Sequence, residues 1–314
     1  MINSMPNRSR SVLIALFALW VVVAVGFQSK IDVISTLLLA GPLIVVPIGL
    51  VHRDGAVPWW MVVGTLSATF AIVLRAYEQS IALLFAIVWV LATVRYALPL
   101  IMRWFAEPAR WNLEVLIRTA APVHLVVASS WLALAVLRRP ILGFGVPLVL
   151  LTSVHFHMAG FGASLLAHRR LLDSENGSRR ERRLAVAGTS LVLAATPTVA
   201  VGHLTTGALE FMGALMMCVG VWSLAGASSL QGARTNGWNA KLLVVSALAS
   251  VAPMLLAVHY GLNRMVTIAP LSYTTIASVH GTLNVFGFLL PGLIATSASK
   301  PVLHAERPAR SVLV

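Results

Sequence analysis

A few ionisable and amide side chains interrupt long apolar stretches of this sequence. Four of them lie well inside such stretches, namely His155, Glu210, His280 and Asn284. Ionisable groups are costly in hydrocarbon, so those that a membrane-spanning helix keeps usually face a bundle interior or a cavity. Because burial disfavours the charged form of a carboxyl group, we expect Glu210 to be partly neutral and to act as a proton donor. The pattern predicts acid–base chemistry in a pocket between helices.

The last apolar stretch carries three of the residues on which this prediction depends. His280, Asn284 and Phe288 recur at intervals of four residues and so share one face of a helix. We expect His280 or His155 to relay the proton and Asn284 to position a polar group of the substrate. The alternative is packing, because polar side chains also join membrane helices by hydrogen bonds.

Two histidines lie close together in the sixth apolar stretch. His155 and His157 are two residues apart, which is about 200° of rotation on a helix, so they point to opposite faces and cannot bind one metal ion together. No metal ligand or cofactor-binding residue is predicted. The side chains expected to line the substrate pocket, beyond the catalytic four, are His124, His157, His203, Phe288 and Trp222.

The composition defines the kind of element that must position these groups. The chain has 314 residues, of which 58% are hydrophobic and 11% charged, and its mean hydropathy is +0.87. A soluble domain carries about 25% charged residues, so a soluble globular enzyme is excluded. Disorder is excluded as well, because it requires low hydrophobicity. What remains is an all-α, polytopic integral membrane bundle.

Apolar runs predict about ten transmembrane helices, each near the ~20 residues that a bilayer requires. Basic side chains in the links on one side outnumber those on the other by about three to one, which places both termini in the cytoplasm. We expect one transmembrane domain over 1–314, with cytoplasmic tails at 1–11 and 299–314 and a basic cytoplasmic loop at 168–183. The expected spans are 12–27, 33–51, 57–74, 80–102, 113–137, 141–167, 184–202, 205–229, 242–259 and 274–297.

Two arginines fall inside expected spans. Arg118 follows Glu114 by four residues, which predicts an ion pair on one helix face. Arg95 requires a partner within the bundle, and Glu114 is also a candidate for that role. We interpret these contacts as structural.

The formal charge of +13 comes from basic residues in the short links. Membrane topology and anionic lipid headgroups explain that placement better than nucleic acid does. The expected partners are therefore the lipid bilayer and a lipophilic small molecule, with no nucleic acid, and the expected location is the plasma membrane.

The single cysteine, Cys218, allows no internal disulfide. Phosphate-binding loops and dinucleotide fingerprints are also missing from the sequence.

Two segments of the sequence resemble the paired signatures of the YndJ-like family of bacterial membrane proteins. They run from Ser153 to Phe161 and from Val279 to Phe288, and the likeness covers mainly the region from Pro122 to Pro291. Met158 stands where the family more often has tyrosine. The resemblance implies a helical membrane fold. It implies little about function, because members are often labelled transporters without a mechanism.

The same two segments are more loosely similar to the haem-binding helices of haem-copper oxidases. That likeness implies that His157 and His280 hold a low-spin haem and that His155 holds a second one. The two helices occur in reversed order along this chain, however, and an adjacent histidine pair for copper is missing. Three hypotheses therefore stand: an intramembrane enzyme of the terpene cyclase or isomerase type, acting on an isoprenoid or epoxide; a transporter of a small lipophilic compound or ion; and a haem-binding oxidoreductase.

Overall fold

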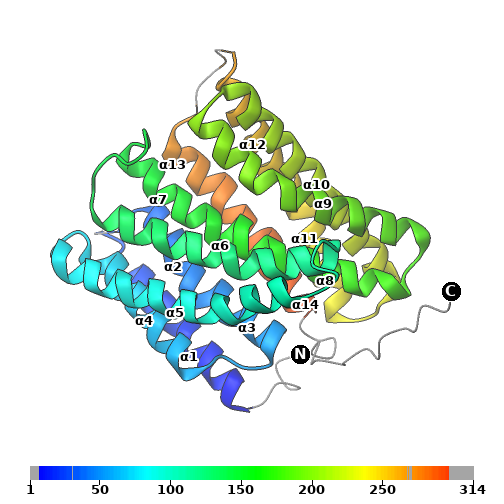
Figure 1. The fold of residues 1–314 in the computed structure, drawn as a ribbon, viewed down its shortest axis with the longest axis horizontal. Helices are drawn as coiled ribbons and strands as arrows, with labels where there is room; N and C mark the ends of the chain where they lie inside the picture. Colours follow the sequence, from blue (N-terminus) through cyan, green and yellow to red (C-terminus); the bar gives the residue numbers. More distant parts are fainter. Residues whose placement is uncertain (1–6, 30, 267, 269–270, 297–314) are drawn as a thin grey trace.

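The computed structural model describes residues 7–29, 31–266, 268 and 271–296, which form an assembly of helices (Figure 1). In these ranges nine helices are long and apolar enough to cross a membrane. A tenth apolar helix, Trp59–Leu74, has only 16 residues. The chain is therefore a helical membrane protein, as the composition predicts. The tail expected at 299–314 lies outside the described residues, as do residues 1–6 of the N-terminal tail.

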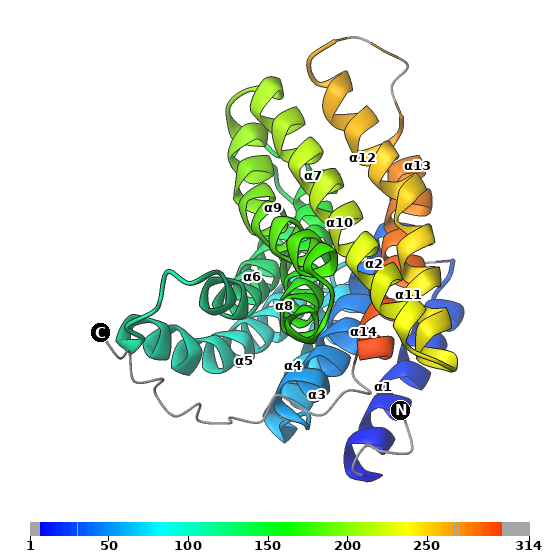
Figure 2. The same cartoon turned by 90° about the vertical axis from the view of Figure 1, so that its right-hand side faces the viewer.

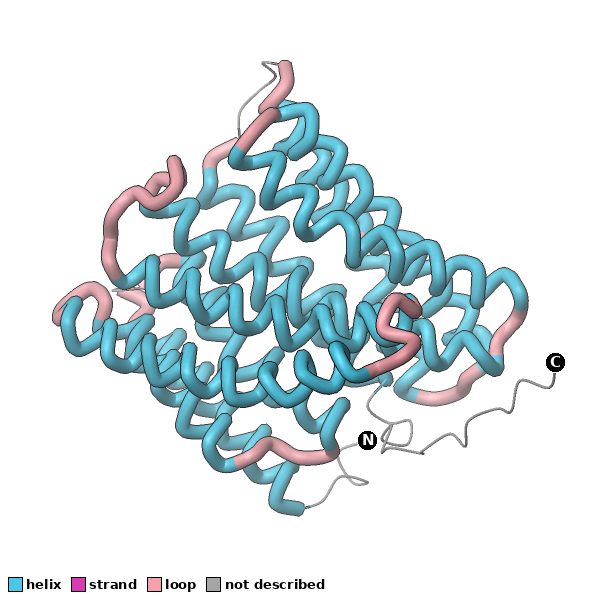
Figure 3. The backbone as a smooth tube through the Cα atoms, in the orientation of Figure 1, coloured by secondary structure: helices cyan, strands magenta, loops and turns pink. Residues whose placement is uncertain are grey.

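The first half of the chain consists of six helical rods joined by short loops, which are pink in Figure 3. Two of these rods contain a short π-helical segment, where each turn holds one residue more than usual. Their elements are α1 (Asn7–Gly26), α2 (Val33–Ala40), the π-helix η2 (Gly41–Val45), α3 (Val46–Asp54), α4 (Trp59–Leu74), α5 (Gln79–Ala106), α6 (Leu113–Val136), α7 (Val146–His155), the π-helix η3 (Phe156–Gly162) and α8 (Ala163–Asp173).

The second half contains two long helices, a broken rod and a final rod that is largely π-helical. The break lies at Ser250, between α11 and α12. The elements are the 3-10 turn η4 (Ser174–Asn176), α9 (Arg179–Leu204), α10 (Gly207–Arg234), α11 (Trp238–Ala249), α12 (Val251–Asn263), α13 (Tyr273–Ile276), the π-helices η5 (Ala277–Gly281) and η6 (Leu283–Leu289), and α14 (Leu290–Thr296).

Polar side chains set the starts of several helices by accepting a hydrogen bond from a free backbone N–H group. The Asp32 carboxylate accepts from the Ser35 nitrogen at 2.8 Å, and the Thr206 hydroxyl accepts from the Leu209 nitrogen at 3.3 Å. Ser178 accepts from the Glu181 nitrogen at 3.1 Å, which starts α9. These caps mark where α2, α9 and α10 begin.

The helices lie side by side across the molecule. Helices α4 and α5 lie on one side of the molecule, α9 and α10 on the other, and α6 and α7 between them (Figure 1). Helix α10 packs against α9, α11 and α12, and the side view shows α10 between α9 and α11 (Figure 2).

The basic segment 168–183 is mostly helical rather than a loop. Helix α8 continues to Asp173, and α9 already begins at Arg179. The Asp173 carboxylate pairs with Arg169 one turn earlier, at 2.9 Å, which stabilises the last turn of α8. Arg169 and Arg170 are consequently buried, although the sequence places them in a solvated link.

Candidate functional site

A cavity of about 490 Å³ lies within the helical bundle. Its walls come from α6, α7, η3, α9, α10, α12, η5 and η6 and are mostly aliphatic and aromatic. The ionisable and hydrogen-bonding side chains among the lining residues are Thr152, His155, Thr196, His203, Glu210, Tyr260, His280 and Asn284. An apolar cavity with a few convergent polar groups is typical of a small-molecule site.

Glu210 is at the centre of a charged cluster on the cavity wall. Its Oε1 accepts a hydrogen bond from His203 Nδ1 at 3.0 Å, and its Oε2 accepts from Arg264 Nε at 3.0 Å. The Glu210 side chain is only 5% exposed, whereas that of Arg264 is 46% exposed. Both carboxylate oxygens are therefore occupied by basic partners, and the cluster extends from the cavity to the surface.

The cluster depends on close contact between the end of α9 and the start of α10. A Cβ atom on Gly202 would overlap the backbone of Glu210 and Leu209, so only glycine fits there. The turn that follows is fixed by Thr206, which caps α10. Glycine and cap together bring His203, the next residue after Gly202, to the carboxylate of Glu210.

His280 and Asn284 form a second polar pair on the cavity wall, as their spacing predicts. The Nδ1 atom of His280 lies 2.6 Å from the carbonyl oxygen of Pro253, which can only accept, so this nitrogen carries the proton. The Nε2 atom then accepts from the Asn284 side-chain amide at 3.1 Å. Phe288, one turn further on, is buried and also lines the cavity. The shared face of these three residues is confirmed.

His155 and His157 point in different directions, which confirms that they cannot share a ligand. His155 lines the cavity, and its buried Nε2 has no hydrogen-bond partner among the described residues. The His157 ring instead stacks on Trp89, with 6.2 Å between the ring centroids. Its Nδ1 donates to the Ser153 carbonyl at 2.8 Å.

Three residues expected in the pocket lie elsewhere. His157 packs against Trp89, as described. His124 Nδ1 donates to the Gly160 carbonyl at 3.1 Å, so this ring joins α6 to η3 instead of lining the cavity. Trp222 is 37% exposed on the outer side of α10.

His157 and His280 do not face a common space, and their positions do not fit a haem held between them. Across the described ranges, no group of three or more His, Cys, Asp or Glu side chains is arranged to hold a metal ion.

Two residues of the cavity region do not belong to the site that the sequence predicts. Arg264 and Tyr260 lie at the end of α12, to which the sequence-based prediction assigns no part in the site. A buried carboxylate requires a partner. Arg264 is a basic residue in the link that follows α12, and this link lies at the same end of the bundle as Glu210. That requirement is the signal that could have identified Arg264.

The likeness to a known family is not limited to the two histidine-bearing segments and covers most of the chain. A family model described as YndJ-like protein matches residues 36–288. The chain belongs to the YndJ-like family. The match includes all the polar side chains that line the cavity and every other lining residue except Leu289. Neither the curated proteins nor the solved structures contain a match to this YndJ-like protein.

Proposed function

We propose that this YndJ-like protein is a membrane enzyme that performs acid–base chemistry on a small lipophilic compound held in the cavity. One observation carries the proposal: five proton-handling or hydrogen-bonding side chains, His155, His203, Glu210, His280 and Asn284, converge on a cavity of about 490 Å³ with mostly apolar walls. Pockets for small molecules commonly have volumes of roughly 300–1,000 Å³. An isoprenoid or an epoxide-bearing lipid is a substrate of suitable size and polarity.

We assign the proton transfer to His203 rather than to Glu210. Both carboxylate oxygens of Glu210 accept hydrogen bonds from basic side chains, so neither oxygen is offered to the substrate. A carboxylate that accepts from Nδ1–H fixes the imidazole tautomer, leaves Nε2 as the proton-accepting atom, and stabilises the imidazolium that forms. Glu210 is then a positioning residue, and His203 takes a proton from one substrate atom and returns it to another.

The second polar pair and His155 recognise the polar part of the substrate in this proposal. His280 uses both ring nitrogens in hydrogen bonds to Pro253 and Asn284. It therefore holds the Asn284 amide in place instead of acting as a base. The amide oxygen of Asn284 is the acceptor offered to the substrate. His155 offers its unpartnered Nε2 to the same polar group.

Binding can be tested before the substrate is known. Solvent extraction of the purified protein is expected to release a lipophilic compound that mass spectrometry detects. Ala200 lines the cavity, so Ala200→Phe places a phenyl ring in it and is expected to reduce recovery of the compound. Ala187 is exposed on the same helix, so Ala187→Phe is the matched control and retains the compound. Equal recovery from the two variants contradicts the proposed site.

Chemistry is tested by hydrogen exchange. In D₂O the wild-type protein is expected to incorporate deuterium into the extracted compound, whereas His203→Gln, which binds it, does not. A compound that binds, gains no deuterium in the wild type and crosses the membrane of sealed vesicles identifies a transporter instead.

We also propose that α4 crosses the plasma membrane together with the nine longer helices, so that ten spans leave both termini in the cytoplasm. The excess of basic residues at the end of the bundle that carries Arg53, Arg169 and Arg234 supports this orientation. A cysteine introduced at Ser178 is then labelled only from the cytoplasmic side, and one introduced at Arg139 only from the outside. The reverse labelling pattern refutes the orientation.

A further inference from the structure

A group of basic side chains gathers at the end of the bundle opposite the Glu210 cluster. It comprises His52 and Arg53 on α3, Arg118 on α6, and His168, Arg169 and Arg170 on α8, and is called the basic cluster below. Arg53 Nη1 donates to the Arg118 carbonyl at 3.3 Å, which joins α3 to α6. Arg53, Arg118, His52 and Arg169 all lie within electrostatic range of the His168 ring.

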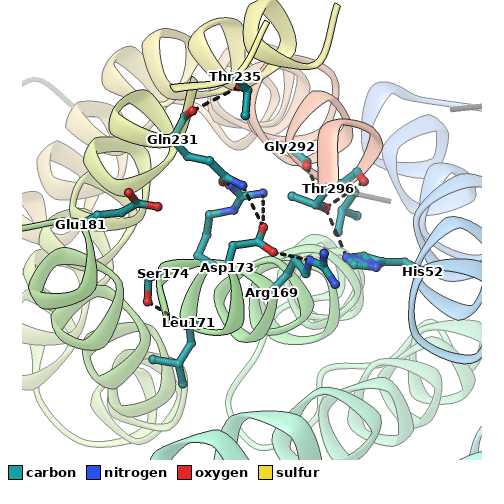
Figure 4. A network of polar contacts seen from close by, with 12 residues as sticks. His52, Arg169, Leu171, Asp173, Ser174, Glu181, Gln231, Thr235, Gly292 and Thr296 are labelled. Atoms are coloured by element: carbon teal, nitrogen blue, oxygen red, sulfur yellow. Dashed lines mark hydrogen bonds and ion pairs between the residues drawn. The ribbon is translucent and has the colours of Figure 1, made fainter. Parts of the chain in front are cut away.

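On the deep side of the basic cluster, Asp173 makes the direct ion pairs, and the buried carboxylate of Glu181 also lies within electrostatic range of Arg170 (Figure 4). Asp173 contacts Arg169 Nε at 2.9 Å and Arg170 Nη2 at 3.5 Å, and it accepts from Gln231 Nε2 at 3.2 Å. Arg170 also donates to the Gln231 side-chain oxygen. The Thr296 hydroxyl lies 3.2 Å from His52 Nε2, which brings the end of α14 against α3.

The outer side of the basic cluster has more positive than negative charge. Arg53 lies 3.8 Å from Asp54, whose carboxylate is also held by Tyr96 at 3.0 Å. Arg118 makes no ion pair with the described residues, and the pair expected with Glu114 does not form. Four arginines thus share two contacting carboxylates, Asp54 and Asp173.

Buried polar atoms of the basic cluster also lack hydrogen bonds. His168 Nε2 and Arg170 Nε are buried and have no partner among the described residues. Buried donors without acceptors are costly, and uncompensated buried charge is costlier still. An anion at Arg53 and Arg118, the members that reach the surface, would offset the excess charge behind them.

The position of the basic cluster indicates the source of that anion. Its residues lie where α3 and α8 end and near the start of α6, and in the membrane arrangement proposed above these helix ends lie near the lipid headgroups. Basic pockets between membrane helices on the cytoplasmic side bind anionic headgroups. We propose that the basic cluster binds the phosphate group of an anionic phospholipid, with Arg53 and Arg118 as the direct donors.

The test measures retention of phosphatidylglycerol by the full chain in mixed micelles with phosphatidylcholine, using native mass spectrometry. Arg118→Gln and Arg53→Gln are each expected to weaken phosphatidylglycerol binding by roughly fivefold and to leave phosphatidylcholine binding unchanged. Arg118→Lys keeps the charge and is expected to restore most of the affinity. Arg182→Gln removes an exposed arginine at the same end of the bundle and is the matched control.

Three results overturn the proposal. One is an equal loss of phosphatidylglycerol in Arg118→Gln and Arg182→Gln, which would indicate only a general surface charge effect. Another is an equal loss of both lipids. The third is inorganic phosphate displacing phosphatidylglycerol at millimolar concentration, which would assign the cluster to a soluble anion. Near-wild-type thermal stability of Arg118→Lys shows that the fold is intact, so its lipid affinity decides the matter if the glutamine variants do not fold.

Discussion

Replacing Glu210 by glutamine tests whether the charged cluster on the cavity wall is organised around His203. Glutamine keeps the size of the side chain and can still accept one hydrogen bond, but it removes the negative charge. The hydrogen bond from His203 Nδ1 and the contact with Arg264 Nε, both 3.0 Å long, are weakened together. We expect a loss of stability, and we expect the contact with His203 to account for the larger part of it.

The size of the loss follows from exposure. The side chains of Glu210 and His203 are 5% and 15% exposed, so water screens their contact little. A hydrogen bond to a charged group contributes roughly 1.5–3 kcal/mol. Arg264 is 46% exposed, and its contact is worth at most about 1 kcal/mol after screening. Glu210→Gln is therefore expected to lower the free energy of unfolding by roughly 2–3 kcal/mol.

The assay is denaturant unfolding of the protein in detergent, followed by tryptophan fluorescence. Double-mutant cycles that combine Glu210→Gln with His203→Ala or Arg264→Gln separate the two pairwise contributions. The coupling to His203 is expected to exceed that to Arg264 by about 1 kcal/mol. Glu114→Gln is the control, because the Glu114 carboxylate has no ion pair in the described structure. A stronger coupling to Arg264, or equal losses for Glu210→Gln and Glu114→Gln, refutes the reasoning.

Two further predictions concern packing near the histidines. Gly41→Ala is expected to cost about 1–3 kcal/mol of stability, because a Cβ atom there would lie 2.9 Å from Cγ of His157. Gly145→Ala, whose added methyl group meets nothing within 4 Å, is expected to be neutral. Ser153→Ala removes a 2.8 Å hydrogen bond to the Ala128 carbonyl and is expected to cost about 0.6 kcal/mol. Thermal denaturation in one detergent measures all three variants, and a loss for Gly145→Ala that exceeds the loss for Gly41→Ala contradicts the packing argument.

The sequence predicts most of the helical architecture because bilayer thickness sets the length of an apolar run. It also predicts local geometry within one helix, such as the opposite directions of His155 and His157 and the shared face of His280 and Asn284. Periodicity alone supplies that information, since residues on one helix are related by a fixed rotation.

Contacts between distant helices are harder to predict. The Arg264–Glu210 contact joins α12 to α10, and nothing in the spacing of the two residues indicates it. The direction of Trp222 depends on which side of α10 meets α9. Charged residues next to a turn look solvated in the sequence, yet Arg170 is buried because α8 continues past the expected end of its span.

The limited length of α4 has a consequence for the lipid around the protein. Its 16 residues extend only about 24 Å, less than the ~30 Å of a typical hydrocarbon core. In the proposed ten-span arrangement, either the bilayer beside α4 becomes thinner or the flanking side chains extend toward the interface, at a modest energetic cost for each ångström of mismatch. We therefore expect acyl-chain length to alter the stability of the protein in a bilayer. We also expect shorter-chain lipids to be enriched beside α4.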